Sequence, residues 1–85
     1  MDKKTIAQSV KDYVLAEFLQ GEKPENLLDS TPLITGGVLD SIGTLKLVTF
    51  LEETYGVRFD AHEVNEENLD CLTDIAKILT EKQAG

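Results

Sequence analysis

The stretch Gly36-Gly37-Val38-Leu39-Asp40-Ser41-Ile42-Gly43 contains the end of a glycine-rich loop and the start of a helix. Asp40 is a residue type that caps helix N-termini, and Gly56 is the type that follows helix C-termini. Between them, apolar residues recur at helical spacing, and two more widen the stripe. They are Ile42, Leu45, Val48, Leu51 and Tyr55, together with Leu47 and Phe50. The sequence therefore predicts a helix over residues 41–55 that begins at Ser41.

Helices are also predicted on both sides of this segment. An apolar face indicates a first helix over about residues 3–20, with Gly21 as its stop. The spacing of Asp60 and Glu63 resembles a capping box and favours a short helix over 61–64. A last helix over 71–82 has Asp70 as its expected cap and an apolar face of Leu72, Ile75, Ala76, Ile78 and Leu79, with fraying from residue 82. The fold class is all-α: a small antiparallel bundle of three main helices plus one short helix, in a single domain spanning residues 1–85.

A long connection, residues 21–40, separates the first two predicted helices. Pro24, Pro32, Gly36 and Gly37 interrupt any regular structure there. Isolated apolar residues are expected to hold the connection against the core. They are Leu27, Leu28, Leu33, Ile34 and Leu39. A loop of this length is unusual in a small domain unless it supports function or neighbouring helices.

Length and charge exclude several classes of function. A chain of 85 residues can form one core but is too short for an enclosed catalytic cleft, so we do not expect an enzyme. A net charge of −8 disfavours nucleic acid and anionic membranes as partners and favours basic protein surfaces. The single cysteine, Cys71, cannot form an intrachain disulfide, and no long apolar segment suggests secretion or membrane insertion. We expect a cytoplasmic monomer.

Ser41 is the candidate for covalent attachment. Unpaired N–H groups and the helix dipole favour an anion at a helix start, so a phosphodiester is well placed there. The sole histidine, His62, lies far along the chain, so Ser41 has no neighbouring base to activate it. A separate transferase is then needed. The alternative is that Ser41 is an ordinary serine at a helix N-terminus.

A wider set of residues resembles the family of acyl and peptidyl carrier proteins. The resemblance includes Leu39-Asp40-Ser41-Ile42, Leu47-Val48, Leu51-Glu52-Glu53 and Tyr55-Gly56-Val57. It continues through Glu67-Asn68-Leu69-Asp70-Cys71-Leu72 and covers about residues 33–79. The family also has a long first connection.

The resemblance implies a non-enzymatic carrier with 4'-phosphopantetheine on Ser41 and Asp40 as the motif aspartate. A phosphopantetheinyl transferase would attach this group, whose thiol holds an acyl or aminoacyl cargo as a thioester for lipid or secondary-metabolite biosynthesis. An adenylating ligase or an acyltransferase would load the cargo. The alternatives are a carrier of fatty-acid synthesis, an unmodified helical adaptor and an acidic domain that binds divalent ions.

The resemblance also implies that partner enzymes dock on the helix that follows Ser41. The candidate docking residues are Ile42, Lys46, Thr49 and Glu53, with Thr44 and Leu47 beside them. Ile42 is equally compatible with core packing. Gly43 and Lys46 stand where fatty-acid carriers frequently have acidic or small polar residues, which favours loading by an adenylating ligase.

The remaining candidates have simpler interpretations. The aromatic residues Tyr13, Phe18, Phe50, Tyr55 and Phe59 fit the core or its edge. Cys71 is expected to be a small, partly buried apolar residue rather than a redox site. The acidic residues Glu63, Glu66, Glu67 and Asp70 lack the pattern of a calcium loop, and His62 lacks a partner at zinc-ligand spacing. We therefore expect no metal site.

Overall fold

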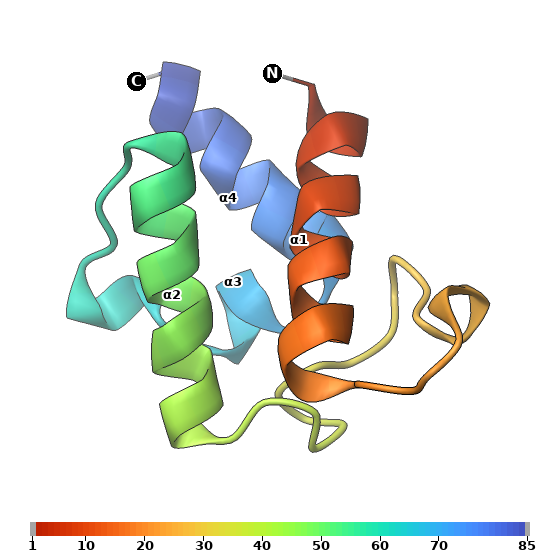
Figure 1. Cartoon of the computed structure of the whole chain (residues 1–85). Coiled ribbons are helices and arrows are strands. Elements are labelled where there is room, and N and C mark those ends of the chain that lie inside the picture. Colours follow the sequence, from red (N-terminus) through yellow and green to blue (C-terminus); the bar gives the residue numbers. More distant parts are fainter. Residues whose placement is uncertain (1, 85) are drawn as a thin grey trace.

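The computed structural model describes residues 2–84, which contain four α-helices and no strand (Figure 1). The helices are α1 (Lys3–Phe18), α2 (Ser41–Tyr55), α3 (Glu66–Leu69) and α4 (Leu72–Ala84). Single turns of 3₁₀-helix occupy Pro24–Asn26 and Ala61–Glu63. The prediction of a small all-helical bundle is confirmed.

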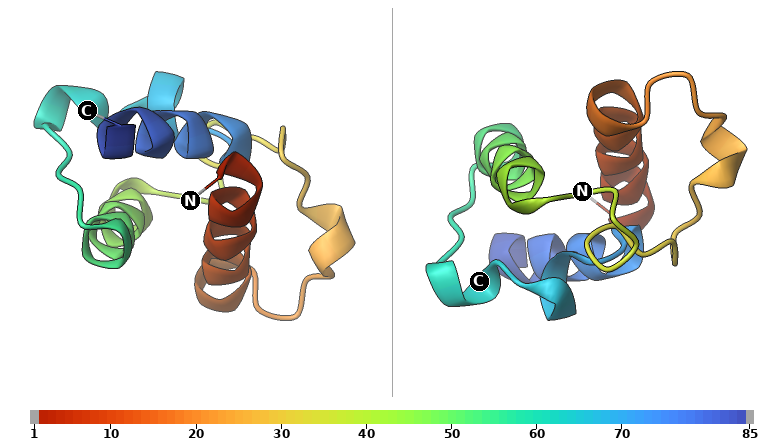
Figure 2. Two further views of the ribbon diagram at one scale, coloured as in Figure 1. Left: turned by 90° about the horizontal axis from the view of Figure 1, so that it is seen from above. Right: turned by 90° about the horizontal axis from the view of Figure 1, so that it is seen from below.

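The three long helices surround one apolar core. Helices α1 and α2 lie side by side and run in opposite directions, and α4 lies across one side of the pair (Figures 1 and 2). Buried side chains come from all three helices, from α3 and from the connection between α1 and α2. They are Ile6, Val10, Val14, Leu27, Leu33, Leu39, Leu47, Val48, Leu51, Leu69, Leu72, Ile75, Ala76 and Leu79. All five aromatic residues are half-buried against this core, as predicted.

The ends of α1 and α2 have identifiable caps. The Thr5 N–H donates to Asp2 Oδ1 (2.8 Å) at the start of α1, which ends at Phe18 rather than at the predicted residue 20. At α2, the Gly43 N–H donates to Asp40 Oδ1 (2.6 Å). Gly56 ends α2 in the left-handed conformation with φ of 66°. This conformation strains residues that have a side chain, so α2 stops there.

The segment between α2 and α4 differs from the prediction. The expected short helix over 61–64 is a 3₁₀ turn, and the following α3 was not predicted. Asn65 caps α3, since its Oδ1 accepts from the Asn68 N–H (3.1 Å). A helix of four residues is too short to show apolar periodicity, which is why sequence reasoning missed it.

The predicted cap of α4 was also wrong. Helix α4 begins at Leu72 and continues to Ala84 rather than fraying from 82, and the Cys71 carbonyl accepts the hydrogen bond from the Ile75 N–H (3.0 Å). Asp70 instead turns its carboxylate to the connection between α1 and α2, where it accepts from the Ile34 N–H (2.8 Å).

In the connection between α1 and α2, Leu27, Leu33 and Leu39 are buried as predicted. Leu28 is exposed, contrary to prediction.

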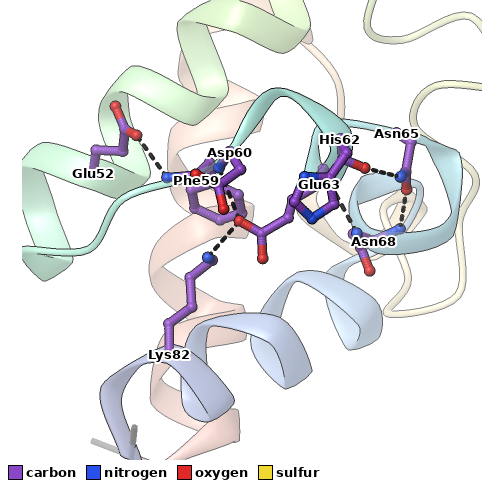
Figure 3. Close-up of polar contacts among 8 residues, drawn as sticks. All are labelled: Glu52, Phe59, Asp60, His62, Glu63, Asn65, Asn68 and Lys82. Atoms are coloured by element: carbon purple, nitrogen blue, oxygen red, sulfur yellow. Dashed lines mark hydrogen bonds and ion pairs between the residues drawn. The ribbon is translucent and has the colours of Figure 1, made fainter.

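A polar cluster joins the 3₁₀ turn at Ala61–Glu63 to α2 and α4 (Figure 3). Glu52 Oε2 of α2 accepts from the Phe59 N–H (2.8 Å). Glu63 Oε1 accepts from the Asp60 N–H (2.8 Å) and from Lys82 Nζ (2.7 Å). Lys82 Nζ also lies 4.8 Å from the centre of the Phe59 ring, within range of a cation–π interaction. These contacts hold the connection from α2 to α3 against the end of α4.

The ion pair of this cluster gives a measurable pKa difference. The hydrogen bond from Lys82, followed by that from the Asp60 N–H, lowers the pKa of Glu63 from its ordinary value of 4.5. Lys82→Met keeps an apolar side chain but removes the donor, so we expect the pKa of Glu63 to rise toward that value. The bond from Asp60 remains, and the rise is therefore partial. NMR titration of the Glu63 carboxyl carbon measures it.

Lys77→Met is the matched control, because Lys77 is an exposed lysine of the same helix. It should leave the pKa of Glu63 unchanged. The lowered pKa means that Glu63 adds stability above its ordinary pKa, and that this stability is lost as the pH falls through the lowered value. An unchanged pKa in Lys82→Met would contradict the ion pair.

Candidate functional site

Ser41 is exposed at the first position of α2, at the end of the bundle opposite the start of α1 (Figure 1). Its neighbour Asp40 provides the side-chain cap of the helix. The Asp40 carbonyl also accepts from the Thr44 N–H and from Thr44 Oγ1, each at 2.8 Å. The first turn of α2 is therefore held by Asp40 and Thr44, and Ser41 remains exposed at the surface.

Two large apolar side chains flank Ser41 on the exposed side of α2. Ile42 is 67% exposed and Leu45 is 61% exposed. The sequence left Ile42 open between the docking surface and the core, and its exposure places this side chain at the surface. Leu45 belongs to the apolar stripe of the predicted helix but is not buried, because α2 turns Gly43, Thr44, Leu47, Val48 and Leu51 inward instead. For the same reason Thr44 and Leu47 are buried and cannot belong to a docking surface.

A shallow groove of about 430 Å³ extends the surface beyond these two residues. Ile42, Leu45, Lys46, Thr49 and Glu53 line it from α2. Tyr13 of α1 and Phe50 of α2 also line it, and their rings stack with centroids 4.0 Å apart. The Tyr13 hydroxyl donates to the Lys46 carbonyl (3.3 Å). Both aromatic residues lie at the edge of the core, as predicted, and they also line this groove.

A second groove, which Ser41 itself lines, has a volume of about 670 Å³. Ile34, Leu45 and Val64 give it apolar walls, and Asn65, Glu66 and Glu67 give it polar walls. Both charged residues that line it are glutamates. The groove is therefore apolar with a negative edge, and it begins beside the Ser41 hydroxyl.

The acidic residues that invited a calcium interpretation do not point to one centre. Glu63 pairs with Lys82, and the carboxylate of Asp70 accepts backbone N–H groups of the connection between α1 and α2. Within residues 2–84, no three histidine, cysteine or acidic side chains are grouped as metal ligands. Cys71 is half-buried, and desolvation is the main cause that raises the pKa of its thiol, so thiolate chemistry is disfavoured.

The geometry suits 4'-phosphopantetheine on Ser41. The exposed hydroxyl is at the N-terminus of a 15-residue helix, where free N–H groups and the helix dipole favour a phosphodiester. The groove that Ser41 lines, about 670 Å³ in volume, leaves room for a long, flexible group. The residues present therefore fit the prosthetic group of carrier proteins.

An exposed serine at the start of α2 in a small helical bundle is the arrangement expected of carrier proteins. No family model matches the chain. Curated relatives do match: D-alanyl carrier proteins of Streptococcus pyogenes serotypes M5 (strain Manfredo), M49 (strain NZ131) and M1. Each is 30% identical over 77 residues, which cover 88% of this chain and 96% of the relative. The chain belongs to the family of acyl and peptidyl carrier proteins.

Across residues 2–84, none of the helices has the length and apolar character needed to cross a membrane.

Packing gives a physical reason for Gly43, which also departs from the residues common in fatty-acid carriers. Gly43 is buried, and a Cβ there would lie 3.0 Å from Asp40 Oδ1 and 3.1 Å from Phe18 Cε1. Gly43→Glu would crowd the cap and place a carboxylate at a buried position. We expect it to lower the free energy of unfolding by about 1–3 kcal/mol, measured by urea denaturation.

Lys46→Glu is the matched control, because it adds a carboxylate on the exposed face of the same helix. Its free energy of unfolding should stay within about 0.5 kcal/mol of the wild-type value. Equal stability of the two variants would show that Gly43 is not required by packing.

Proposed function

We propose that this chain is a freestanding carrier of aminoacyl or acyl groups, with 4'-phosphopantetheine attached to Ser41. The observation that supports it most is the exposed Ser41 hydroxyl at the start of α2, next to a cap that Asp40 provides. Because Ser41 itself does not accept that capping bond, modification of its hydroxyl leaves the cap intact. The thiol of the bound group holds the cargo as a thioester. The protein acts as a tether rather than as an enzyme.

We further propose that the cargo is a small aminoacyl group. The relatives are named D-alanyl carrier proteins, and the groove beside Ser41 supports a related cargo here. The charged residues that line this groove are Glu66 and Glu67. An ammonium group is attracted by this negative edge, whereas a carboxylate is repelled. An adenylating ligase is the class of enzyme that activates such an amino acid.

Partner enzymes are proposed to dock on the exposed side of α2. Ile42 and Leu45 supply apolar area, and Lys46, Thr49 and Glu53 supply polar and charged groups on the same side. Tyr13 and Phe50 continue this surface toward α1. The partners include a phosphopantetheinyl transferase, the ligase and the enzyme that receives the cargo. We place this work in the cytoplasm and the carrier in the monomeric state.

An unmodified adaptor is the second candidate, because the exposed Ile42 and Leu45 are equally available to a partner that needs no prosthetic group. Intact mass separates the two functions. Incubation with coenzyme A and a broad-specificity phosphopantetheinyl transferase should add one phosphopantetheine to a carrier. An adaptor keeps its mass.

Ser41→Ala should abolish this modification and keep the fold. Asp40 still caps α2, and Ser41 is exposed, so the helical circular dichroism signal should match that of the wild-type chain. Ser9→Ala, in the middle of α1, is a control that should be modified at the wild-type rate. If the Ser41→Ala chain still gained the mass of phosphopantetheine, the attachment residue would be another one.

Ile42→Asp and Lys46→Glu test the docking surface separately. Ile42→Asp places an unpaired charge in an apolar contact, so we expect at least a tenfold loss in kcat/KM for aminoacyl loading. Lys46→Glu should act mainly on the association rate, and its effect should weaken as salt is raised. Loading kinetics of the modified proteins at low and high salt measure both effects.

Lys77→Glu on α4 is the control for a general change in net charge. It should reduce the loading rate much less than Lys46→Glu does. Equal effects of the two lysine substitutions would mean that the ligase senses net charge and not this surface.

A further inference from the structure

Asp70 joins the junction of α3 and α4 to the connection that leads to Ser41. Its Oδ1 accepts from the Ile34 N–H (2.8 Å) and from the Thr35 N–H (2.9 Å). Its Oδ2 accepts from Thr35 Oγ1 (2.8 Å). The Asp70 carbonyl accepts from the Leu33 N–H. One residue thus binds three consecutive residues that are about 35 positions away in the sequence.

The segment that Asp70 binds continues directly into the start of α2. The Leu39 N–H donates to the Leu33 carbonyl (2.8 Å), which closes residues 33–39 into a loop. Both leucines are buried. Leu39 is followed by Asp40, the cap of α2, and then by Ser41. The position of Ser41 relative to α3 and α4 therefore depends on the loop that Asp70 holds.

Tight local packing makes this loop a single unit. A Cβ on Gly36 would lie 2.2 Å from the Pro32 carbonyl oxygen, so the chain passes too closely there for any side chain. Gly37 has a φ of 84°, and its N–H donates to the Ile34 carbonyl (3.2 Å). The Leu39–Leu33 and Gly37–Ile34 hydrogen bonds tie residues 33 and 34 to residues 39 and 37, so a displacement at residues 33–35 is passed on to residue 39.

We propose that Asp70 is a positioning residue for the modification of Ser41. It keeps the loop of residues 33–39 in the arrangement that presents Ser41 to the phosphopantetheinyl transferase. The inference rests on the proposed function. Without the Asp70 carboxylate, residues 33–39 can adopt several arrangements, and only one of them is competent, meaning that it presents Ser41 to the transferase. The apparent affinity of the transferase then falls in proportion to the fraction of competent molecules.

The predicted signature is a change in KM without a change in kcat. In Asp70→Ala, a molecule that reaches the competent arrangement reacts at the normal rate, so kcat is retained. The KM of the transferase for the carrier should rise about fivefold or more. Hydrogen exchange should accelerate at the amides of Ile34, Thr35 and Leu39. Amides in the middle of α1 should exchange as in the wild-type chain.

Two control variants separate positioning from general stability. Asp70→Asn keeps an oxygen that can accept from the Ile34 and Thr35 N–H groups, and its amide can donate to Thr35 Oγ1. It should restore most of the wild-type KM. Ile6→Val removes one methylene group from the buried face of α1, near the N-terminal end of that helix. It should lower the melting temperature and leave KM unchanged.

Thr35→Val keeps the test available if Asp70→Ala fails to fold, because it removes only the contact with Oδ2. It should raise KM by a smaller factor. The inference is overturned if Asp70→Ala folds with wild-type KM, or if Ile6→Val raises KM as much as Asp70→Ala does. Accelerated exchange at the loop with unchanged KM also overturns it. Failure of the wild-type chain to accept phosphopantetheine would refute the proposed function instead, and the exchange measurement would still report on the hydrogen bonds.

Discussion

The connection between α1 and α2 must be held against the helices without regular structure of its own, and the placement of Ser41 depends on how this is done. Buried backbone N–H and C=O groups need hydrogen-bond partners, and a segment without helix or strand forms few of these bonds within itself. Here Leu27, Leu33 and Leu39 anchor the connection in the core, and Asp70 accepts hydrogen bonds from its backbone. These contacts hold the connection against α3, α4 and the core.

The first two turns of α2 have one side against the core and the other side in contact with solvent. Gly43 and Thr44 face inward and allow α2 to approach Phe18 of α1 closely. Ile42 and Leu45 face outward and remain more than half exposed. Complete burial of a fully exposed apolar side chain of this size is worth about 1.5–3 kcal/mol, so the exposed parts of Ile42 and Leu45 leave a share of that free energy available for a partner. The proposed attachment residue, Ser41, and the proposed docking surface are therefore positioned by the same part of α2.

The sequence predicted the parts of the fold that depend on local chemistry. Asp40 and Gly56 mark the ends of α2 because a carboxylate cap and a left-handed glycine are local requirements. It failed where the outcome depends on contacts far along the chain. Asp70 has the spacing of a cap for α4, yet its carboxylate accepts hydrogen bonds from Ile34 and Thr35, and no local pattern reveals these partners.

The same distinction applies to the candidate site. Ser41 was recognisable from its motif, but the neighbouring apolar residues were not sorted correctly by periodicity. Leu45 has the spacing of a core residue, and only the rotation of α2 against α1 shows that Thr44 is buried in its place. Tyr13 joins the surface for a similar reason, because its ring reaches Phe50 of the other helix. The helical phase of a first turn is decided by tertiary packing.

A carrier must release each partner after every transfer, and the surface described above suits brief contacts. Its apolar part consists mainly of Ile42 and Leu45, which is far less than the area buried in a permanent interface. In the proposed function, a tethered cargo compensates for this weakness, since attachment raises its effective concentration at a docked enzyme to about the millimolar range. Weak docking is then sufficient for transfer. In the proposed docking surface, charges such as Lys46 and Glu53 are expected to act chiefly on encounter and on the choice of partner. Since these residues are exposed and outside the core, partner specificity can change by substitution there without changing the fold.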